Sequence, residues 1–175
     1  MTRIIATFFY SGLLPKAPGT WGSLAAWIIA VCLFWLGAST SLLFLLTVIV
    51  CFVGWWATAA ETRGKDDHDP SEIVIDEVAG QWIALLPLYA IARDLNLMEQ
   101  FQSGANELQQ AINLNVLFFT AFILFRIFDI FKPWPISWAD RMNTPFGVML
   151  DDILAGLMSW LPYILLIIVV VQLDG

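Results

Sequence analysis

The stretch of sequence that decides the fold is Ile73-Val-Ile-Asp-Glu-Val-Ala-Gly-Gln-Trp-Ile-Ala-Leu-Leu-Pro-Leu-Tyr-Ala-Ile-Ala92. As a helix it is long enough to cross the roughly 30 Å hydrocarbon core of a bilayer. Asp76 and Glu77 lie in its first turn. Because carboxylates are costly inside hydrocarbon, that end must lie at headgroup level. The stretch therefore predicts a membrane-spanning helix with two carboxylates at one membrane face.

Four further apolar segments surround this one. The predicted spans lie near 21–37, 41–60, 73–92, 116–131 and 148–171. The fourth becomes a good span when Arg126 and Asp129, close to its end, lie at headgroup level. We predict an all-α fold, a polytopic membrane helical bundle of about five spans, as a single domain over 1–175. Residues 1–20 are predicted to form an interfacial segment and a Gly/Pro loop, and 93–115 an outside loop or surface helix.

The composition supports a membrane location. Apolar residues make up 59% of the chain, charged residues only 13%, and the mean hydropathy is +0.77. A soluble domain is roughly 25% charged. In water this chain would expose large apolar patches, whereas in a bilayer the same surface is in its preferred solvent. The composition therefore argues against a soluble domain.

Joining the spans brings most charged residues to one membrane face. The acidic ones are Asp66, Asp67, Asp69, Glu72, Asp76, Glu77, Asp129, Asp151 and Asp152. The basic ones are Arg3, Lys16, Arg63, Lys65, Arg126, Lys132 and Arg141. Only Arg93 falls on the opposite side, and an excess of basic residues in short loops marks the cytoplasmic face. We therefore expect the N-terminus inside and the C-terminus outside.

The loop at 14–23 runs directly into the first span. Thr20 or Ser23 can cap that helix, since both are good N-cap residues. Free backbone N–H groups at a helix start, with Gly19 allowing close approach and Lys16 adding charge, could also cradle a phosphate. A simple turn with an N-cap is the alternative.

Two pairs of adjacent carboxylates lie early in apolar spans. Asp76 and Glu77 point about 100° apart on a helix, so one can face the bundle interior. Asp151 and Asp152 have no basic residue within one helical turn. Unpaired carboxylates so close to hydrocarbon favour metal ligation or proton chemistry. Gly156, one turn further on, would admit a close helix neighbour.

The end of the fourth span combines charge with proline. Arg126 and Asp129 are three residues apart and can pair on one helical face, and Pro133 then ends the helix. Lys132 is placed to meet an anionic headgroup, and Trp134 is expected to anchor at the interface. A purely structural ion pair is the alternative reading of this motif.

Oxygen ligands without a Cys or His cluster suit a hard cation, and Mg²⁺ is the expected one. A carboxylate-held metal surrounded by basic residues suits an anionic phosphate substrate, and a lipid phosphate would arrive at this depth. A cation-coupled transporter or a membrane lipid-phosphate transferase could use the same carboxylates. Whether His68, the single histidine, takes part stays open.

The four motifs together resemble a known family. They are Ala17-Pro-Gly-Thr-Trp-Gly-Ser23, Asp69-Pro-Ser-Glu-Ile-Val-Ile-Asp-Glu-Val-Ala-Gly80, Arg126-Ile-Phe-Asp-Ile-Phe-Lys-Pro-Trp-Pro135 and Asp151-Asp152. In this order they are similar to bacterial phosphatidylglycerophosphatase A. The resemblance implies Mg²⁺-dependent removal of the terminal phosphate of phosphatidylglycerophosphate, which yields phosphatidylglycerol in the inner membrane. We expect the bilayer and this lipid as partners, and no nucleic acid; the oligomeric state stays open.

Position and charge suggest a role for each site residue. The expected metal ligands are Asp76, Glu77, Asp129, Asp151 and Asp152. The expected catalytic residues are Asp76, Asp129 and Asp152, of which Asp76 or Asp152 takes a proton from the attacking water. The expected substrate-binding residues are Lys16, Thr20, Arg126 and Lys132.

Overall fold

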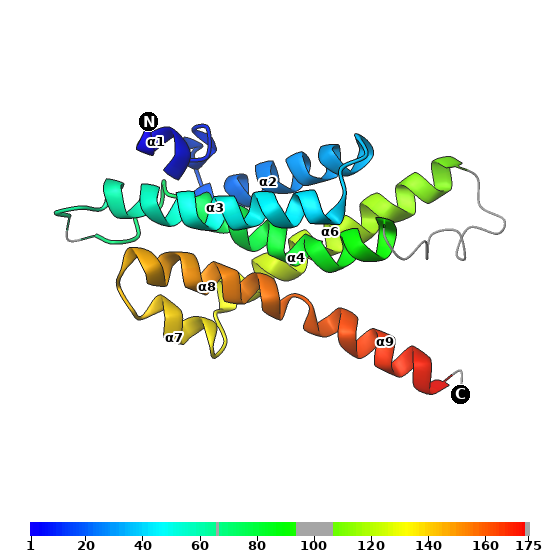
Figure 1. Cartoon of the computed structure of the whole chain (residues 1–175). Coiled ribbons are helices and arrows are strands. Elements are labelled where there is room, and N and C mark those ends of the chain that lie inside the picture. The colour runs from blue at the N-terminus through cyan, green and yellow to red at the C-terminus, as the bar shows by residue number, and fades with distance from the viewer. Residues whose placement is uncertain (66, 94–106, 174–175) are drawn as a thin grey trace.

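The computed structural model describes residues 1–65, 67–93 and 107–173 (Figure 1). Its elements are α1 (Thr2–Ala6), the 3-10 turn η1 (Ser11–Leu13), α2 (Pro18–Trp35), α3 (Thr40–Glu61), α4 (Ile75–Arg93), α6 (Glu107–Phe131), α7 (Ile136–Asp140), α8 (Pro145–Met158) and α9 (Leu161–Leu173). Every regular element in these ranges is helical, which confirms the predicted all-α class. The expectations for Asp66 and for 94–106 fall outside the described residues.

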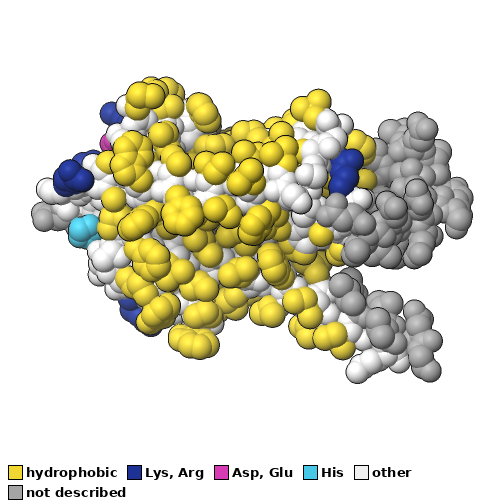
Figure 2. Space-filling model, viewed as in Figure 1, with side chains coloured by type: hydrophobic (Ala, Val, Ile, Leu, Met, Phe, Trp, Pro, Cys, Tyr) yellow, Lys and Arg dark blue, Asp and Glu magenta, His cyan; other side chains and the backbone are white. Residues whose placement is uncertain are grey.

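Five stretches of helix are long and apolar enough to cross a membrane. They are Pro18–Trp35, Thr40–Glu61, Ile75–Arg93, Asn113–Phe131 and Pro145–Leu165. The prediction of five spans is therefore confirmed, and the protein is a multi-pass membrane protein. Figure 2 shows hydrophobic side chains spread across the visible face, with basic side chains and the histidine mainly at the end where α1 lies.

Helix α4 is the centre of the bundle. About two thirds (67%) of its span is buried, against 28% to 39% for the other four spans, and it packs against α2, α3, α6 and α8. Gly80 and Gly156 let α4 and α8 approach backbone to backbone. A methyl group on Gly80 would lie 2.5 Å from the Asp152 carbonyl oxygen, and one on Gly156 would collide with the Gly80 carbonyl. The close helix neighbour expected at Gly156 is therefore α4.

Indole groups tie the helices together inside the bundle. Three indole N–H groups donate to a backbone carbonyl of another helix at 2.9 Å: Trp27 to Phe118, Trp82 to Ala26, and Trp160 to Ile83. Water cannot satisfy an N–H group at hydrocarbon depth, so each donor needs a protein acceptor. These bonds help set the spacing of α2, α4, α6 and the α8–α9 junction.

The segment predicted as one span at 148–171 is two helices. Helix α8 ends at Met158 and α9 begins at Leu161, and α9 diverges from the bundle in Figure 1. Pro162 explains the break, because its ring would clash with the carbonyl four residues earlier, at Met158, and it has no N–H to donate there. The candidate span continues across this break to Leu165.

The first span begins earlier than expected. Pro18 is the first residue of α2 and Ala17 is the N-cap, with no side-chain cap hydrogen bond. The Ser23 hydroxyl instead donates to the Gly19 carbonyl at 2.7 Å, inside the helix. Capping by Thr20 or Ser23 was therefore a wrong prediction. The fixed φ of proline suits the first helical position, so Pro18 sets the start of the helix.

Candidate metal centre and active site

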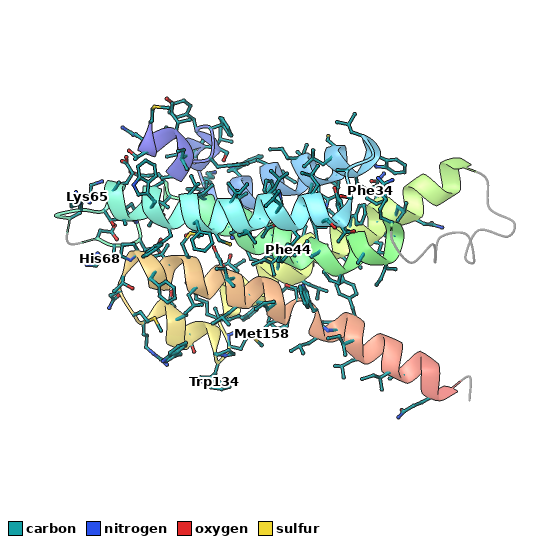
Figure 3. All side chains as sticks on the ribbon, in the orientation of Figure 1. Phe34, Phe44, Lys65, His68, Trp134 and Met158 are labelled. Atoms are coloured by element: carbon teal, nitrogen blue, oxygen red, sulfur yellow. The ribbon has the colours of Figure 1, made fainter. Side chains whose placement is uncertain are left out.

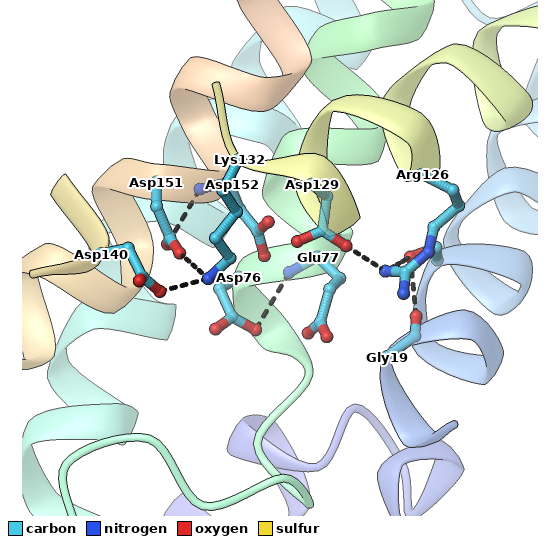
Figure 4. Close-up of polar contacts among 10 residues, drawn as sticks. Gly19, Asp76, Glu77, Arg126, Asp129, Lys132, Asp140, Asp151 and Asp152 are labelled. Atoms are coloured by element: carbon cyan, nitrogen blue, oxygen red, sulfur yellow. Dashed lines mark hydrogen bonds and ion pairs between the residues drawn. The ribbon is translucent and has the colours of Figure 1, made fainter. Parts of the chain in front are cut away.

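The charged ends of four helices meet at one end of the bundle. These are the starts of α2, α4 and α8 and the end of α6 (Figures 1 and 4). Figure 3 shows Lys65 and His68 at this end, while Phe34 lies toward the opposite end. Arg93 caps that opposite end, donating to the Phe34 carbonyl with its guanidinium carbon 4.2 Å from the Phe34 ring centroid. The charge separation expected from the sequence is thus present in the fold.

Three carboxylates converge at the centre of the site. Each of Asp76, Glu77 and Asp152 offers one oxygen, and these oxygens all lie within 4.8 Å of one another. We call these residues the carboxylate trio. Asp76 and Asp152 are each only 4% exposed and Glu77 is partly buried, so the trio lies mostly inside the bundle (Figure 4).

In each pair of adjacent acids, the first carboxylate is held by a backbone N–H group. Asp76 accepts a hydrogen bond from the Glu77 N–H at 3.0 Å, and Asp151 accepts one from the Asp152 N–H at 3.0 Å. Asp76 and Glu77 also lie in the first turn of α4, where the helix dipole favours negative charge. The local structure therefore orients these carboxylates before any ligand arrives.

The trio fits a hard divalent cation. Oxygen Oε2 of Glu77 is buried without a hydrogen-bond partner, and none of the ion pairs found in the described part of the chain involves the trio. Three like charges in a buried space repel one another unless a cation or protons neutralise them. Carboxylate oxygens are the ligands that Mg²⁺ prefers. The donor set therefore matches the expected metal.

Arg126 joins α6 to α2 beside the trio. Its Nη1 lies 2.5 Å from Oδ2 of Asp129, which confirms the pairing expected from their three-residue spacing. The same nitrogen donates to the Ser23 hydroxyl at 3.2 Å. Asp129 in turn lies close enough to Glu77 and Asp152 to interact with both electrostatically (Figure 4).

Gly19 makes room for two of these side chains. A methyl group on Gly19 would collide with Oε1 of Glu77 and would lie 3.3 Å from Nη1 of Arg126. The sequence predicted a close approach at this glycine, and in the fold the side chains that approach it come from α4 and α6. Thr20, the next residue, is half-buried. Lys16 is exposed, and its carbonyl accepts the Trp21 indole N–H at 3.1 Å.

Lys132 bridges two aspartates. Its ammonium donates to Asp151 at 2.7 Å and also to Asp140. Burial lowers the pKa of Lys132, but these two hydrogen bonds outweigh burial and hold the pKa above its ordinary value. Lys132 therefore stays charged at neutral pH, and its charge compensates Asp151.

An open cavity adjoins Asp151. It has a volume of about 470 Å³ and is lined by Asp67, His68, Asp69, Asp140, Asn143, Val148 and Asp151. His68 thus lies on the wall of an approach to the site and outside the trio. Glu72 lines a smaller, separate cavity with Arg3 and Lys65, so not all acids at this end belong to one centre.

Besides the bond from Lys132 to Asp151, where the sequence predicted an unpaired carboxylate, two contacts in this site were missed from the sequence. Asp140, which pairs with Lys132, lies eight residues further on, beyond the Pro133–Pro135 turn, and no helical periodicity links the two. Ser23 was considered only as a cap, although it binds Arg126 from another helix. Both contacts depend on tertiary packing, which leaves no local signal.

Comparison with known proteins gives a consistent result. The family profile described as Phosphatidylglycerophosphatase A matches residues 4–167. A Bacteroides thetaiotaomicron protein named "Putative phosphatidylinositol-3-phosphatase" is 36% identical, over 90% of this chain and 88% of its own. Proteins named Phosphatidylglycerophosphatase A from Escherichia coli and Haemophilus influenzae are 34% and 35% identical, over 90% and 89% of this chain and 78% and 82% of theirs. No solved structure matches the chain.

Proposed function

The chain belongs to the phosphatidylglycerophosphatase A family, and from this premise we propose that it is a Mg²⁺-dependent lipid phosphatase. Its substrate is phosphatidylglycerophosphate, and its products are phosphatidylglycerol and inorganic phosphate. The observation that carries the proposal is the carboxylate trio, buried at the end of the bundle where Arg126 and Lys132 also lie.

The acidic residues divide into two groups in this proposal. Asp76, Glu77 and Asp152 hold the metal directly, and Asp129 and Asp151 complete its surroundings while paired to basic side chains. When bound, Mg²⁺ supplies positive charge to phosphoryl oxygens and lowers the pKa of a water molecule. Asp76 or Asp152 accepts the proton of the attacking water. Both are suited to this role because they are buried next to other carboxylates.

The basic residues hold the phosphate. Arg126 uses Nη1 for both Asp129 and Ser23, so other guanidinium N–H groups remain for phosphate oxygens. Lys132 has three N–H donors and uses two on Asp140 and Asp151. Lys16 precedes α2 and Thr20 lies in its first turn, and both add contacts to the phosphate. The phosphate is thus bound by charge while the acids position the attacking water.

The reaction takes place at the cytoplasmic face of the bacterial inner membrane. The site lies at the helix ends that share their side with most of the basic residues, which supports this orientation. Trp134, which is 78% exposed, can anchor the α6–α7 connection in the interface. A lipid can therefore present its headgroup phosphate to the trio without leaving the bilayer.

The test is phosphate release from phosphatidylglycerophosphate by detergent-purified protein, with Mg²⁺ or with chelator. Phosphatidic acid and phosphatidylinositol-3-phosphate serve as competing substrates. We expect metal-dependent release that prefers phosphatidylglycerophosphate, is lost in Asp152→Asn and is kept in the matched control Glu61→Gln. Equal phosphate release from a competing lipid would overturn the headgroup assignment. If no phosphate is released with any metal, the protein is better explained as a transferase or a transporter.

A further inference from the structure

Gln81 is a buried amide that no contact in the fold explains. It lies in the second turn of α4 and is 0% exposed, and neither Nε2 nor Oε1 has a hydrogen-bond partner among the residues that the structure describes. Two other polar side chains of α4 differ in this respect, because Trp82 donates to Ala26 and Tyr89 to Ala30 of α2. An unpaired amide inside a membrane bundle is destabilising, so its presence calls for a partner.

The missing partner lies one helical turn away. Gln81 follows Glu77 by four residues, so the two side chains share one face of α4. Oε2 of Glu77 is also buried and also lacks a partner. One group is an N–H donor and the other an acceptor, and Glu77 is the trio member that Gly19 and Arg126 already surround.

We propose that Gln81 is a positioning residue for Glu77, with its Nε2 donating to Oε2 of Glu77 either directly or through one buried water. This contact fixes the orientation of the Glu77 carboxylate and so raises the affinity of the trio for a divalent cation. The inference rests on the metal site of the proposed function. Partners of this kind behind a ligand change metal affinity by roughly 10- to 100-fold.

The test measures metal binding apart from turnover. Mn²⁺ is titrated into detergent-purified protein, and the free ion is followed by electron paramagnetic resonance. Gln81→Met keeps the length of the side chain but removes both polar atoms. Tyr89→Phe is the matched control, because it also removes a buried polar group from α4, several turns away from the trio.

The two variants should respond in opposite ways. We expect Gln81→Met to stay folded and to bind Mn²⁺ at least about tenfold more weakly, because Glu77 loses the donor that orients it. Saturating Mn²⁺ should restore its phosphate release. Tyr89→Phe should unfold at a lower temperature with unchanged Mn²⁺ affinity. Gln81→Leu gives a second version if the Met variant aggregates.

Two outcomes would overturn the inference and can be told apart. Wild-type Mn²⁺ affinity in a folded Gln81 variant would reject the positioning role while leaving the metal site intact. A wild-type protein that binds no Mn²⁺ would reject the metal site itself and the inference with it.

Discussion

Replacing Gly19 with alanine should separate the stability of the fold from the function of the site. Gly19 lies in the first turn of α2 with an ordinary helical backbone, so alanine suits the conformation and could stabilise the helix by up to about 1 kcal/mol. The added methyl group, however, would collide with Oε1 of Glu77 and would lie 3.3 Å from Nη1 of Arg126. The Glu77 carboxylate is the end of a flexible side chain, so we expect the carboxylate to be displaced while the helix positions remain unchanged.

The magnitude follows from that displacement. The carboxylate must retreat by about 1 Å to restore van der Waals contact, and a misplacement of this size can lower a rate by about 10²-fold. That factor corresponds to about 2.7 kcal/mol of transition-state stabilisation. We therefore expect Gly19→Ala to unfold at a temperature no lower than that of the wild type, to lose about two orders of magnitude in phosphate release at limiting Mg²⁺, and to recover part of it at saturating Mg²⁺.

The assay pairs phosphate release with thermal unfolding followed by tryptophan fluorescence. Gly37→Ala is the matched control, because Gly37 has φ 91° and no atom within 4 Å of an added methyl group. Alanine there should lower stability by about 1 kcal/mol and leave turnover unchanged. Turnover of Gly19→Ala within twofold of the wild type at limiting Mg²⁺ would show that the Glu77 position does not matter.

Three further substitutions test the fold and the charges. Gly80→Ala presses a methyl group against the α8 backbone and should destabilise the protein by about 1–3 kcal/mol in SDS-induced unfolding; an unchanged midpoint would contradict the close helix contact. Lys132→Met leaves Asp151 buried without its cation and should cost about 3 kcal/mol, whereas Asp140→Asn, at an exposed pair, should cost less than about 1 kcal/mol. Because the pKa of Lys132 is raised in the fold, Lys132 stays charged from neutral pH up to about pH 10 and its contribution is lost only above that, so a difference that shrinks between about pH 8 and pH 10 would refute the pairing. Glu77→Gln removes one of three like charges, so it should raise the unfolding temperature in chelator and weaken Mg²⁺ binding at least about tenfold. A lower unfolding temperature in chelator would argue against repulsion in the trio.

Local patterns in the sequence were sufficient for the spans and for one ion pair. Hydropathy over a helix-length window identified five spans, because the bilayer selects apolar residues wherever a side chain faces lipid. The Arg126–Asp129 pair followed from a spacing of three residues, which fixes two side chains on one helical face. The break before α9 could also have been expected from Pro162, whose effect on a helix is local.

The sequence by itself determined that this protein crosses a membrane and carries its carboxylates at one end of the spans, since both properties depend on residues close together in the chain. Only the tertiary structure decided which acids form the trio, which of them Lys132 and Arg126 neutralise, and that Gln81 lies buried behind Glu77. These choices depend on the distances between α2, α4, α6 and α8. Close contacts at Gly19, Gly80 and Gly156 set those distances, and they join residues far apart in the sequence.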